Sequence, residues 1–415
     1  MNRVLELDLT QMAHGGEALG RAPDGRVVFV GYALPGERVR ARLTDVRKRW
    51  ARGVAEAVLR PSPDRVEPPC PHFGPQACGG CQWQHAAYEA QLRYKTAIVR
   101  EQLRRLGKLD DGAVRPCIGM AEPWHYRNHV QLRVDEAGRL GFVRADGQGI
   151  EPIETCLIMN PAVHDLFHQL EADFPALRRV ALRGSTRTGD RMVILETDED
   201  EPPEVEVDFP VSVVLVLGDG TPVTLVGSPY IYEEVAGRRW RVSATSFFQV
   251  NTEMADRLVE LVREAAAPLY GIETVIDAYA GVGTLGISLA PDAGHVILVE
   301  ANPVAVEDAR ANAADGDNVS WVEGATEEVL PAWEGPRPDL VVLDPPRAGC
   351  APAVLEALTA LRPQKVVYVS CDTATLARDL GRLVRGGFAL RWVQPLDMFP
   401  QTYHVETVTL LEWSG

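Results

Sequence analysis

The chain has 415 residues, enough for two or three domains, and its hydrophobic content of 46% is ordinary for a globular protein. It has no apolar stretch of about 18 residues and no signal-peptide pattern at its N-terminus, so we expect a cytoplasmic protein without a membrane partner. The net charge of −16 argues against a uniformly basic surface. Basic residues nevertheless outnumber acidic ones in residues 1–60 and 90–145, and residues 196–208 are strongly acidic. The sequence is therefore compatible with one basic face.

The N-terminal region is predicted to form a small β-barrel. Short runs such as VLELDL and RVVFVGY are rich in β-branched residues, and turn signals at Gly15–Gly16, Asp24–Gly25 and Pro35–Gly36 separate them. Several short strands within about sixty residues suit an OB-type fold. The proline-rich segment 61–70 follows as a linker, so we place the first domain at residues 1–62.

Residues 63–240 are predicted to form a central α+β domain. Apolar residues recur at helical spacing within residues 88–106, and Gly107 is a natural C-cap for this helix. Runs such as HVQLRV and VSVVLVL between residues 127 and 235 indicate a mostly antiparallel sheet.

Four of the seven cysteines are candidate ligands of a metal or cluster. Cys70, Cys78 and Cys81 form C-x7-C-x2-C, and Cys156 lies far downstream in ETCLIMNP. An odd number of cysteines in a chain expected to be intracellular argues against a disulfide framework. Four thiolates suit either zinc or a [4Fe–4S] cluster, and the spacing is compatible with both.

The C-terminal region, residues 241–415, is predicted to be Rossmann-like. From about residue 274, short apolar strands alternate with helices, which is typical of a doubly wound parallel sheet. Gly281, Gly283 and Gly286 form GxGxxG between the first strand and the next helix. This context predicts a cofactor site, although the glycines also suit close helix–strand packing.

Two carboxylates narrow the choice of cofactor. Asp277 stands just before the glycine-rich turn, where its charge would repel a dinucleotide pyrophosphate and suit the cationic methionine end of S-adenosylmethionine. Glu300 ends the second strand, a position from which a carboxylate reaches ribose hydroxyls. The pair therefore favours S-adenosylmethionine over a nicotinamide or flavin cofactor.

Further reactive groups end neighbouring strands. Asp344 follows a strand in LDPPRAG, and Cys371 follows the next in VYVSCD. Because ligands of open α/β sheets bind beyond the carboxyl ends of the strands, Asp277, Glu300, Asp344 and Cys371 are expected at one rim. Cys371 is the candidate nucleophile, and a helix N-terminus after it is expected to lower its pKa. Glu406, in the last strand, is the candidate base, although a solvent-facing carboxylate fits the same pattern.

Five motifs in order, together with the cysteine set, resemble the RNA (uracil-5-)-methyltransferases over nearly the whole chain. The resemblance is strongest to the 23S ribosomal RNA branch, which has an N-terminal TRAM domain and an iron–sulfur cluster. The motifs are SFFQVN (246–251), DAYAGVGTLGISLA (277–290), LDPPRAG (343–349), YVSCDTATLARD (368–379) and DMFPQTYHVE (397–406).

The resemblance implies a TRAM barrel over residues 1–62, a [4Fe–4S] cluster rather than zinc on the four cysteines, and S-adenosylmethionine as the cofactor. It implies that Cys371 attacks C6 of a uridine and that Glu406 removes the C5 proton after methyl transfer. Phe247 would stack on the target base, and Arg127 would contact RNA. The residues implied at the cofactor are Gln249, Tyr279, Gly281, Gly283, Thr284, Glu300 and Asp344.

The substrate expected from the resemblance is 23S ribosomal RNA, with transfer RNA as the alternative, and the chain is expected to act as a monomer. Two other classes fit parts of the sequence. A dinucleotide-dependent iron–sulfur oxidoreductase would use GxGxxG and the cysteines but gives no role to Cys371. A non-catalytic RNA-binding protein would use the barrel but has no need of Cys371 and Glu406.

Overall fold

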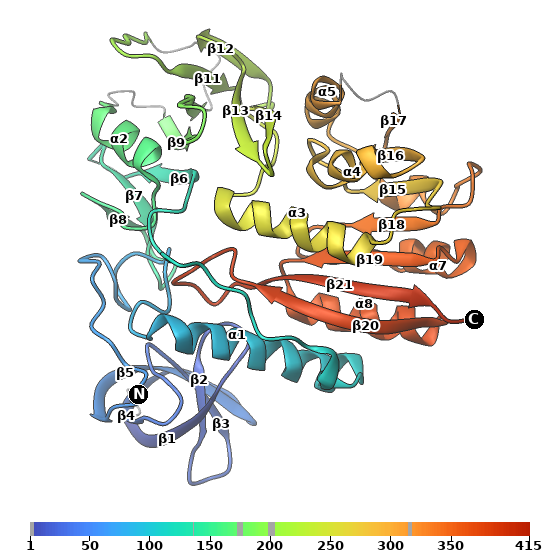
Figure 1. Cartoon of the computed structure of the whole chain (residues 1–415). Coiled ribbons are helices and arrows are strands. Elements are labelled where there is room, and N and C mark those ends of the chain that lie inside the picture. Colours follow the sequence, from blue (N-terminus) through green and yellow to red (C-terminus); the bar gives the residue numbers. More distant parts are fainter. Residues whose placement is uncertain (1–3, 136, 172–176, 198–203, 314–317) are drawn as a thin grey trace.

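The computed structural model has a closed barrel, two seven-stranded sheets and a two-stranded hairpin, and helix α1 (Tyr88–Gln102) lies between the barrel and the C-terminal sheet (Figure 1). Within the part of the chain that the structure describes, no helix is long and apolar enough to cross a membrane. The described residues are 4–135, 137–171, 177–197, 204–313 and 318–415.

The N-terminal strands form a closed five-stranded barrel in the order β1-β2-β3-β5-β4, which confirms the predicted β-barrel. Alternate residues such as Leu7 and Leu9 point into its core, as a strand period of two requires. The strands are β1 (Val4–Met12), β2 (Ala18–Arg21), β3 (Val27–Gly31), β4 (Arg38–Val46) and β5 (Trp50–Arg60).

Helix α1 packs on both the barrel and the C-terminal sheet. Tyr94 and Ile98 lie in the hydrophobic core of the barrel, whereas Val99 and Leu103 lie in a core shared with the C-terminal strands. The helix lies between the blue barrel and the red strands in Figure 1. It therefore fixes the barrel relative to the C-terminal sheet.

The predicted end of this helix is wrong. The chain continues from α1 into a π-helical turn, η1 (Leu103–Gly107), and the left-handed residue that ends it is Lys108, with φ 57°. Gly107 instead permits close packing against α8 (Thr373–Arg385), because a Cβ on Gly107 would lie 2.9 Å from the Ala377 carbonyl oxygen. A glycine at the end of a helical pattern therefore marked a close helix contact and not a C-cap.

The central sheet has seven strands in the order β12-β11-β10-β9-β6-β7-β8. Only the β10–β11 pair is parallel, so the predicted mostly antiparallel sheet is confirmed. Helix α2 (Pro161–Gln169) packs on it, and the hairpin of β13 (Tyr230–Val235) and β14 (Arg238–Ser243) follows. The strands are β6 (His129–Val134), β7 (Leu140–Val143), β8 (Ile150–Pro152), β9 (Leu177–Gly184), β10 (Arg191–Thr197), β11 (Ser212–Val216) and β12 (Pro222–Val226).

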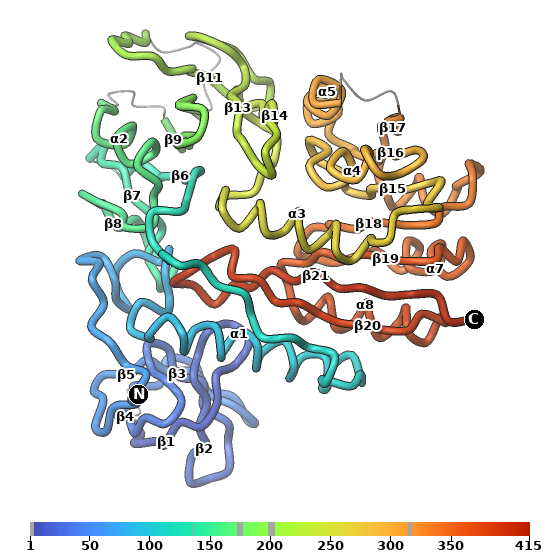
Figure 2. The backbone as a smooth tube through the Cα atoms, viewed as in Figure 1, coloured from blue at the N-terminus to red at the C-terminus, as the bar shows by residue number. Residues whose placement is uncertain are grey.

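Between α1 and the central sheet, the chain runs back along the C-terminal strands. It passes through the short helix η2 (Asp111–Ala113), and then Val114 and Ile118 form isolated bridges with Val393 and Leu396. Figure 2 shows this segment crossing from the end of α1 towards β6. The central region is thus attached to the C-terminal sheet by backbone pairing.

The C-terminal sheet has the order β17-β16-β15-β18-β19-β21-β20, with five parallel strands followed by an antiparallel pair. This confirms the Rossmann-like prediction, while the divisions at residues 62 and 240 stay predictions. The strands are β15 (Thr274–Ala278), β16 (His295–Glu300), β17 (Val319–Glu323), β18 (Leu340–Leu343), β19 (Lys365–Ser370), β20 (Phe388–Leu396) and β21 (Glu406–Trp413).

Helices cover both faces of this sheet, so its strands are apolar on both sides. Neighbouring residues such as Val341 and Val342 belong to two different hydrophobic cores. One core includes α3 (Thr252–Ala266), α4 (Thr284–Leu289), η3 (Ala290–Asp292) and α5 (Pro303–Asn312); the other includes α6 (Thr326–Val329), α7 (Pro352–Leu361) and α8.

Candidate active site

The glycine-rich turn follows β15 at the carboxyl edge of the sheet. Tyr279, Gly281 and Gly283 have φ values of 65°, 55° and 87°, a backbone region that glycine adopts without strain. The Gly281 N–H donates to Glu300 Oε2 over 2.8 Å, and the Asn302 N–H donates to Glu300 Oε1 over 2.7 Å. The turn therefore folds around the carboxylate at the end of β16.

Asp277 lies beneath this turn and is only 1% exposed. Its Oδ2 accepts from the Gly286 N–H over 2.7 Å, and its Oδ1 has no hydrogen-bond partner among the described residues. A Cβ on Gly286 would lie 2.7 Å from Asp277, so this glycine permits close strand–helix contact. Burial raises the pKa of Asp277 to about 7.

Of the other residues predicted at the cofactor, Tyr279, Thr284 and Asp344 lie on the same rim. Thr284 begins α4, Asp344 directly follows β18, and the Tyr279 hydroxyl donates to Glu327 over 2.8 Å. Gln249 lies just before α3, and its carbonyl oxygen accepts from Asn128. Their roles towards a cofactor stay predictions.

Cys371 and Glu406 are brought together by strand pairing. Cys371 follows β19 and Glu406 begins β21, and in this antiparallel pair Ser370 lies opposite Thr407. The next residues of the register are therefore Cys371 and Glu406. The Glu406 side chain is buried, and its Oε1 has no hydrogen-bond partner in the described part of the chain. A buried, unpartnered carboxylate oxygen opposite a cysteine is suited to accept a proton from a bound molecule.

The electrostatic environment contradicts the expectation of a lowered thiol pKa. Burial, followed by the charges of Glu406 and Asp344, raises the pKa of Cys371 to about 12, and the charge of Arg347 acts in the opposite direction. Burial, followed by the charge of Asp344, also raises the pKa of Glu406 well above its ordinary value. Two nearby carboxylates and burial thus outweigh the helix N-terminus that follows Cys371. A cationic ligand at this rim would favour the charged forms of both groups.

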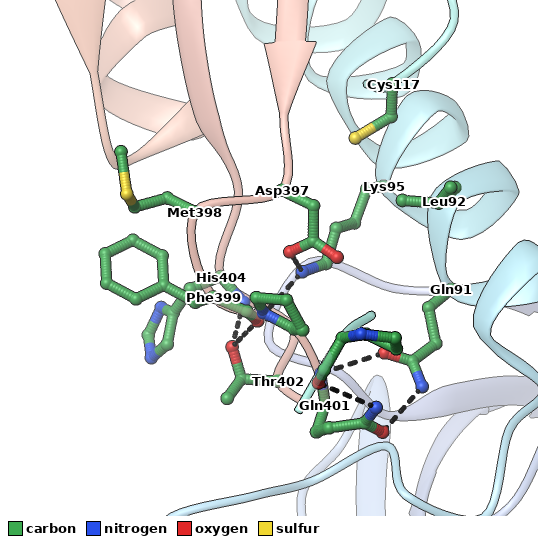
Figure 3. Close-up of polar contacts among 12 residues, drawn as sticks. Gln91, Leu92, Lys95, Cys117, Asp397, Met398, Phe399, Gln401, Thr402 and His404 are labelled. Carbon is green, nitrogen blue, oxygen red and sulfur yellow. Dashed lines mark hydrogen bonds and ion pairs between the residues drawn. The ribbon is translucent and has the colours of Figure 1, made fainter. Parts of the chain in front are cut away.

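The loop that leads into Glu406 is anchored to α1 by an ion pair and a pair of glutamines (Figure 3). The Lys95 ammonium group, fully buried, donates to Asp397 Oδ1 over 2.5 Å and to the Phe399 carbonyl over 3.1 Å. Gln91 Nε2 donates to Gln401 Oε1 over 2.9 Å, and the Gln401 N–H donates back to Gln91 Oε1 over 3.0 Å. Helix α1 therefore sets the position of the chain just before the candidate base.

The four candidate ligand cysteines line one cavity of about 430 Å³ between residues 70–84 and the central sheet. Arg127 and Phe247 line the same cavity, and Phe247 is 65% exposed. Burial raises the pKa of Cys78 to about 12, and the charges of Cys156 and Cys70 add to this effect. Within the described ranges, no three His, Cys, Asp or Glu side chains form a compact metal-binding group.

Sequence reasoning missed the buried anchor on α1. The apolar stripe of this helix contains Leu92 and Val99, and Lys95 lies three residues after one and four before the other. A lysine on the buried face of a helix is a signal that a partner carboxylate must exist. Its partner, Asp397, lies 302 residues away, so the sequence pattern offered no means of finding it.

Comparison with known proteins identifies the family. The family model described as tRNA (uracil-5-)-methyltransferase matches residues 225–414, and the TRAM domain model matches residues 2–55. The chain is 40% identical to an uncharacterized RNA methyltransferase of Halalkalibacterium halodurans, over 99% of this chain and 97% of that protein. It belongs to the RNA (uracil-5-)-methyltransferase family.

Other similar proteins agree with this assignment. An uncharacterized RNA methyltransferase of Streptomyces avermitilis is 41% identical over 99% of both chains. The crystal structure of Pyrococcus abyssi tRNA (uracil-54, C5)-methyltransferase in complex with S-adenosyl-L-homocysteine superimposes with a TM-score of 0.77 and 26% identity, covering 98% of this chain and 100% of that one. The chain is thus an S-adenosylmethionine-dependent RNA methyltransferase, and the predicted TRAM domain is confirmed.

Proposed function

We propose that this methyltransferase forms 5-methyluridine in 23S ribosomal RNA through a covalent adduct between Cys371 Sγ and C6 of the uridine, acting as a monomer in the cytoplasm. The observation that carries the proposal is the register of β19 and β21, which sets Cys371 opposite the buried carboxylate of Glu406. C5 of uracil is a weak nucleophile, so the reaction requires both a nucleophile at C6 and a base for the C5 proton.

The residues act in sequence. The Cys371 thiolate forms a bond to C6, and the electron pair of the C5–C6 double bond moves towards the C4 carbonyl as an enolate. C5 then takes the methyl group that S-adenosylmethionine supplies. Glu406, as a carboxylate, removes the C5 proton, and the double bond re-forms as the S–C6 bond breaks. The positive charge of the methyl donor near Asp344 favours the ionised states that Cys371 and Glu406 need.

The proposed donor site is the carboxyl rim of β15, β16 and β18. Glu300 would accept hydrogen bonds from the ribose hydroxyls. Its carboxylate already lies beside the glycine-rich turn, where it accepts from the Gly281 N–H. Tyr279, Gly283 and Thr284 of the turn would complete this wall. Asp344 and Gln249 would lie between the donor and the uridine, and Phe247, which is largely exposed, would stack on the base.

The four cysteines support a [4Fe–4S] cluster. A single zinc ion would hold its sulfurs at about 2.3 Å, which needs a compact ligand group. All four cysteines instead line a cavity of about 430 Å³, a space that suits a larger inorganic cluster. Cys70, Cys78, Cys81 and Cys156 would hold it. Its role would be to fix the linker to the central sheet beside Arg127, since methyl transfer needs no electron transfer.

Ribosomal RNA is the proposed substrate because the resemblance that includes this cysteine set is strongest to that branch. Transfer RNA is the second candidate. The Pyrococcus abyssi enzyme, described as acting on uracil 54 of tRNA, matches nearly the whole chain.

The test is methyl transfer from labelled S-adenosylmethionine to total RNA of a strain that lacks the gene, with ribosomal and transfer RNA separated afterwards. Label as 5-methyluridine in the large ribosomal RNA is expected from the wild type and none from Cys371→Ala. Cys117→Ala is the matched control, because it also removes a buried thiol, which lies in the hydrophobic core that α1 shares with the C-terminal strands. Label only in transfer RNA would show that transfer RNA, and not 23S ribosomal RNA, is the substrate. Full turnover by Cys371→Ala would refute the mechanism.

A further inference from the structure

Two histidine side chains face each other on helix α2, which covers the central sheet. His164 and His168 are four residues apart, so they lie one turn apart on the same side of the helix. Their Nε2 atoms are 3.3 Å apart, and their rings are inclined at 69° with centroids 4.5 Å apart. His168 is exposed and His164 is half-buried, so the pair is open to solvent. Neither residue lines the cavity of the four cysteines.

The separation of the two nitrogen atoms suits a shared metal ion better than a direct hydrogen bond. Hydrogen bonds from nitrogen donors usually span about 2.7–3.2 Å, and the 3.3 Å between the two Nε2 atoms is longer. A tetrahedral zinc ion with Zn–N distances of about 2.0–2.1 Å separates two nitrogen ligands by about 3.3–3.4 Å. Because His168 is exposed, its ring can turn by the small angle that aims both nitrogen lone pairs at one ion.

The surroundings of the pair favour a bound cation. Burial, followed by the charge of His168, lowers the pKa of His164, so this imidazole is neutral at physiological pH, as a metal ligand must be. His168 lies in the last turn of α2, where the helix dipole favours positive charge. The Thr155 hydroxyl oxygen lies 3.1 Å from His164 Nε2, within reach of a water molecule on the same ion. Asp165 adds a negative charge that acts on His164, although Arg191 lies 3.5 Å from it.

We propose that His164 and His168 bind a zinc ion on α2, separate from the four cysteines and from the reaction. Imidazole nitrogen suits zinc and its neighbours among the transition metals, whereas magnesium and calcium take oxygen ligands. Two protein ligands leave the other coordination positions to water, which agrees with the lack of a compact three-residue group in the described ranges. The ion would join two turns of α2, a helix of nine residues that is too short to be stable by itself.

The test is zinc binding to the full chain, measured by competition with a chromophoric chelator. Wild type, His164→Gln and His168→Gln are purified anaerobically in the same way. Because the cysteines can also take up zinc, the decisive quantity is the difference between wild type and each variant. Wild type is expected to bind one zinc ion per chain more than either variant. His168 is exposed, so its replacement by glutamine should leave the fold unchanged.

Gln169→Ala is the matched control, because Gln169 is exposed in the same turn of α2 and has no imidazole. It should bind as much zinc as the wild type. Equal zinc binding by wild type and both histidine variants would overturn the proposal. A loss of the same zinc ion in Gln169→Ala would overturn it as well, since binding would then depend on the stability of the helix and not on the two imidazoles.

Hydrogen–deuterium exchange tests whether the ion binds on α2. An ion that needs both helical turns favours the closed helix over its locally open states by one plus the ratio of free zinc to Kd. At a free zinc concentration about 100 times Kd, amide exchange in residues 161–169 of the wild type should slow by about 100-fold. Zinc should leave exchange in this segment of His168→Gln unchanged. No slowing in the wild type, or equal slowing in the variant, would refute the site, whether or not the chain methylates RNA.

Discussion

Replacing Lys95 with methionine should destabilise the junction between α1 and the loop before Glu406. Lys95 and Asp397 are both fully buried, and their charges are joined by a 2.5 Å hydrogen bond. Methionine fills a similar volume but leaves the Asp397 carboxylate buried without its cation. Removing one partner of a buried ion pair costs about 3–5 kcal/mol of folding free energy. At about 2–4 °C per kcal/mol for a unit of this size, the thermal midpoint should fall by about 6–20 °C.

The assay is thermal unfolding followed by circular dichroism, with limited proteolysis to locate the first site of cleavage. Lys48→Met is the matched control, because Lys48 is exposed in a barrel turn and its loss should shift the midpoint by less than about 2 °C. The double variant Lys95→Met with Asp397→Leu removes both charges and should recover most of the lost stability. A midpoint for Lys95→Met within about 2 °C of the wild type would show that the ion pair contributes little, and the reasoning would be refuted.

Three further predictions address the site. Glu406→Gln should accumulate a methylated, denaturation-stable protein–RNA adduct on gels, because the base that releases Cys371 is lost; rapid turnover without adduct would contradict this. The pKa of Asp277 is raised from 3.8 to about 7 in the folded protein. Between these two pH values, Asp277 is therefore protonated in the folded protein and ionised in the unfolded chain. Stability of the donor-free enzyme should therefore fall as pH rises from about 4 to about 7, and Asp277→Asn should flatten this slope in thermal scans. Anaerobically purified wild type should contain iron and sulfide; Cys81→Ser should lack both, whereas Cys117→Ser should keep them, and a wild type without iron and sulfide would contradict the proposed cluster.

Patterns that are local in the sequence determined much of this protein. Apolar residues that recur every second position predicted strands, and those that recur about every 3.6 positions predicted helices, which together predicted the order of elements. The glycine-rich turn marked the start of the parallel sheet. Because the strands of that sheet run in one direction, residues that end different strands share an edge. This rule placed Glu300, Asp344 and Cys371 on one rim without any structure. The spacing of Cys70, Cys78 and Cys81 likewise indicated that they bind the same metal ion or cluster. It did not show that Cys156 lies close to them in space.

Only the tertiary structure decided the contacts on which the chemistry depends. Lys95 meets Asp397 across 302 residues, and His14 meets Thr373 across 359. No periodic pattern encodes such pairs, because each side chain is polar and its burial depends on a partner from another element. The thiol pKa of Cys371 is a further example. A helix start in the sequence suggested a lowered value, but burial and the carboxylates of β21 and the β18 rim raise it. Electrostatics follows distances in space, and the sequence by itself supplies only distances along the chain.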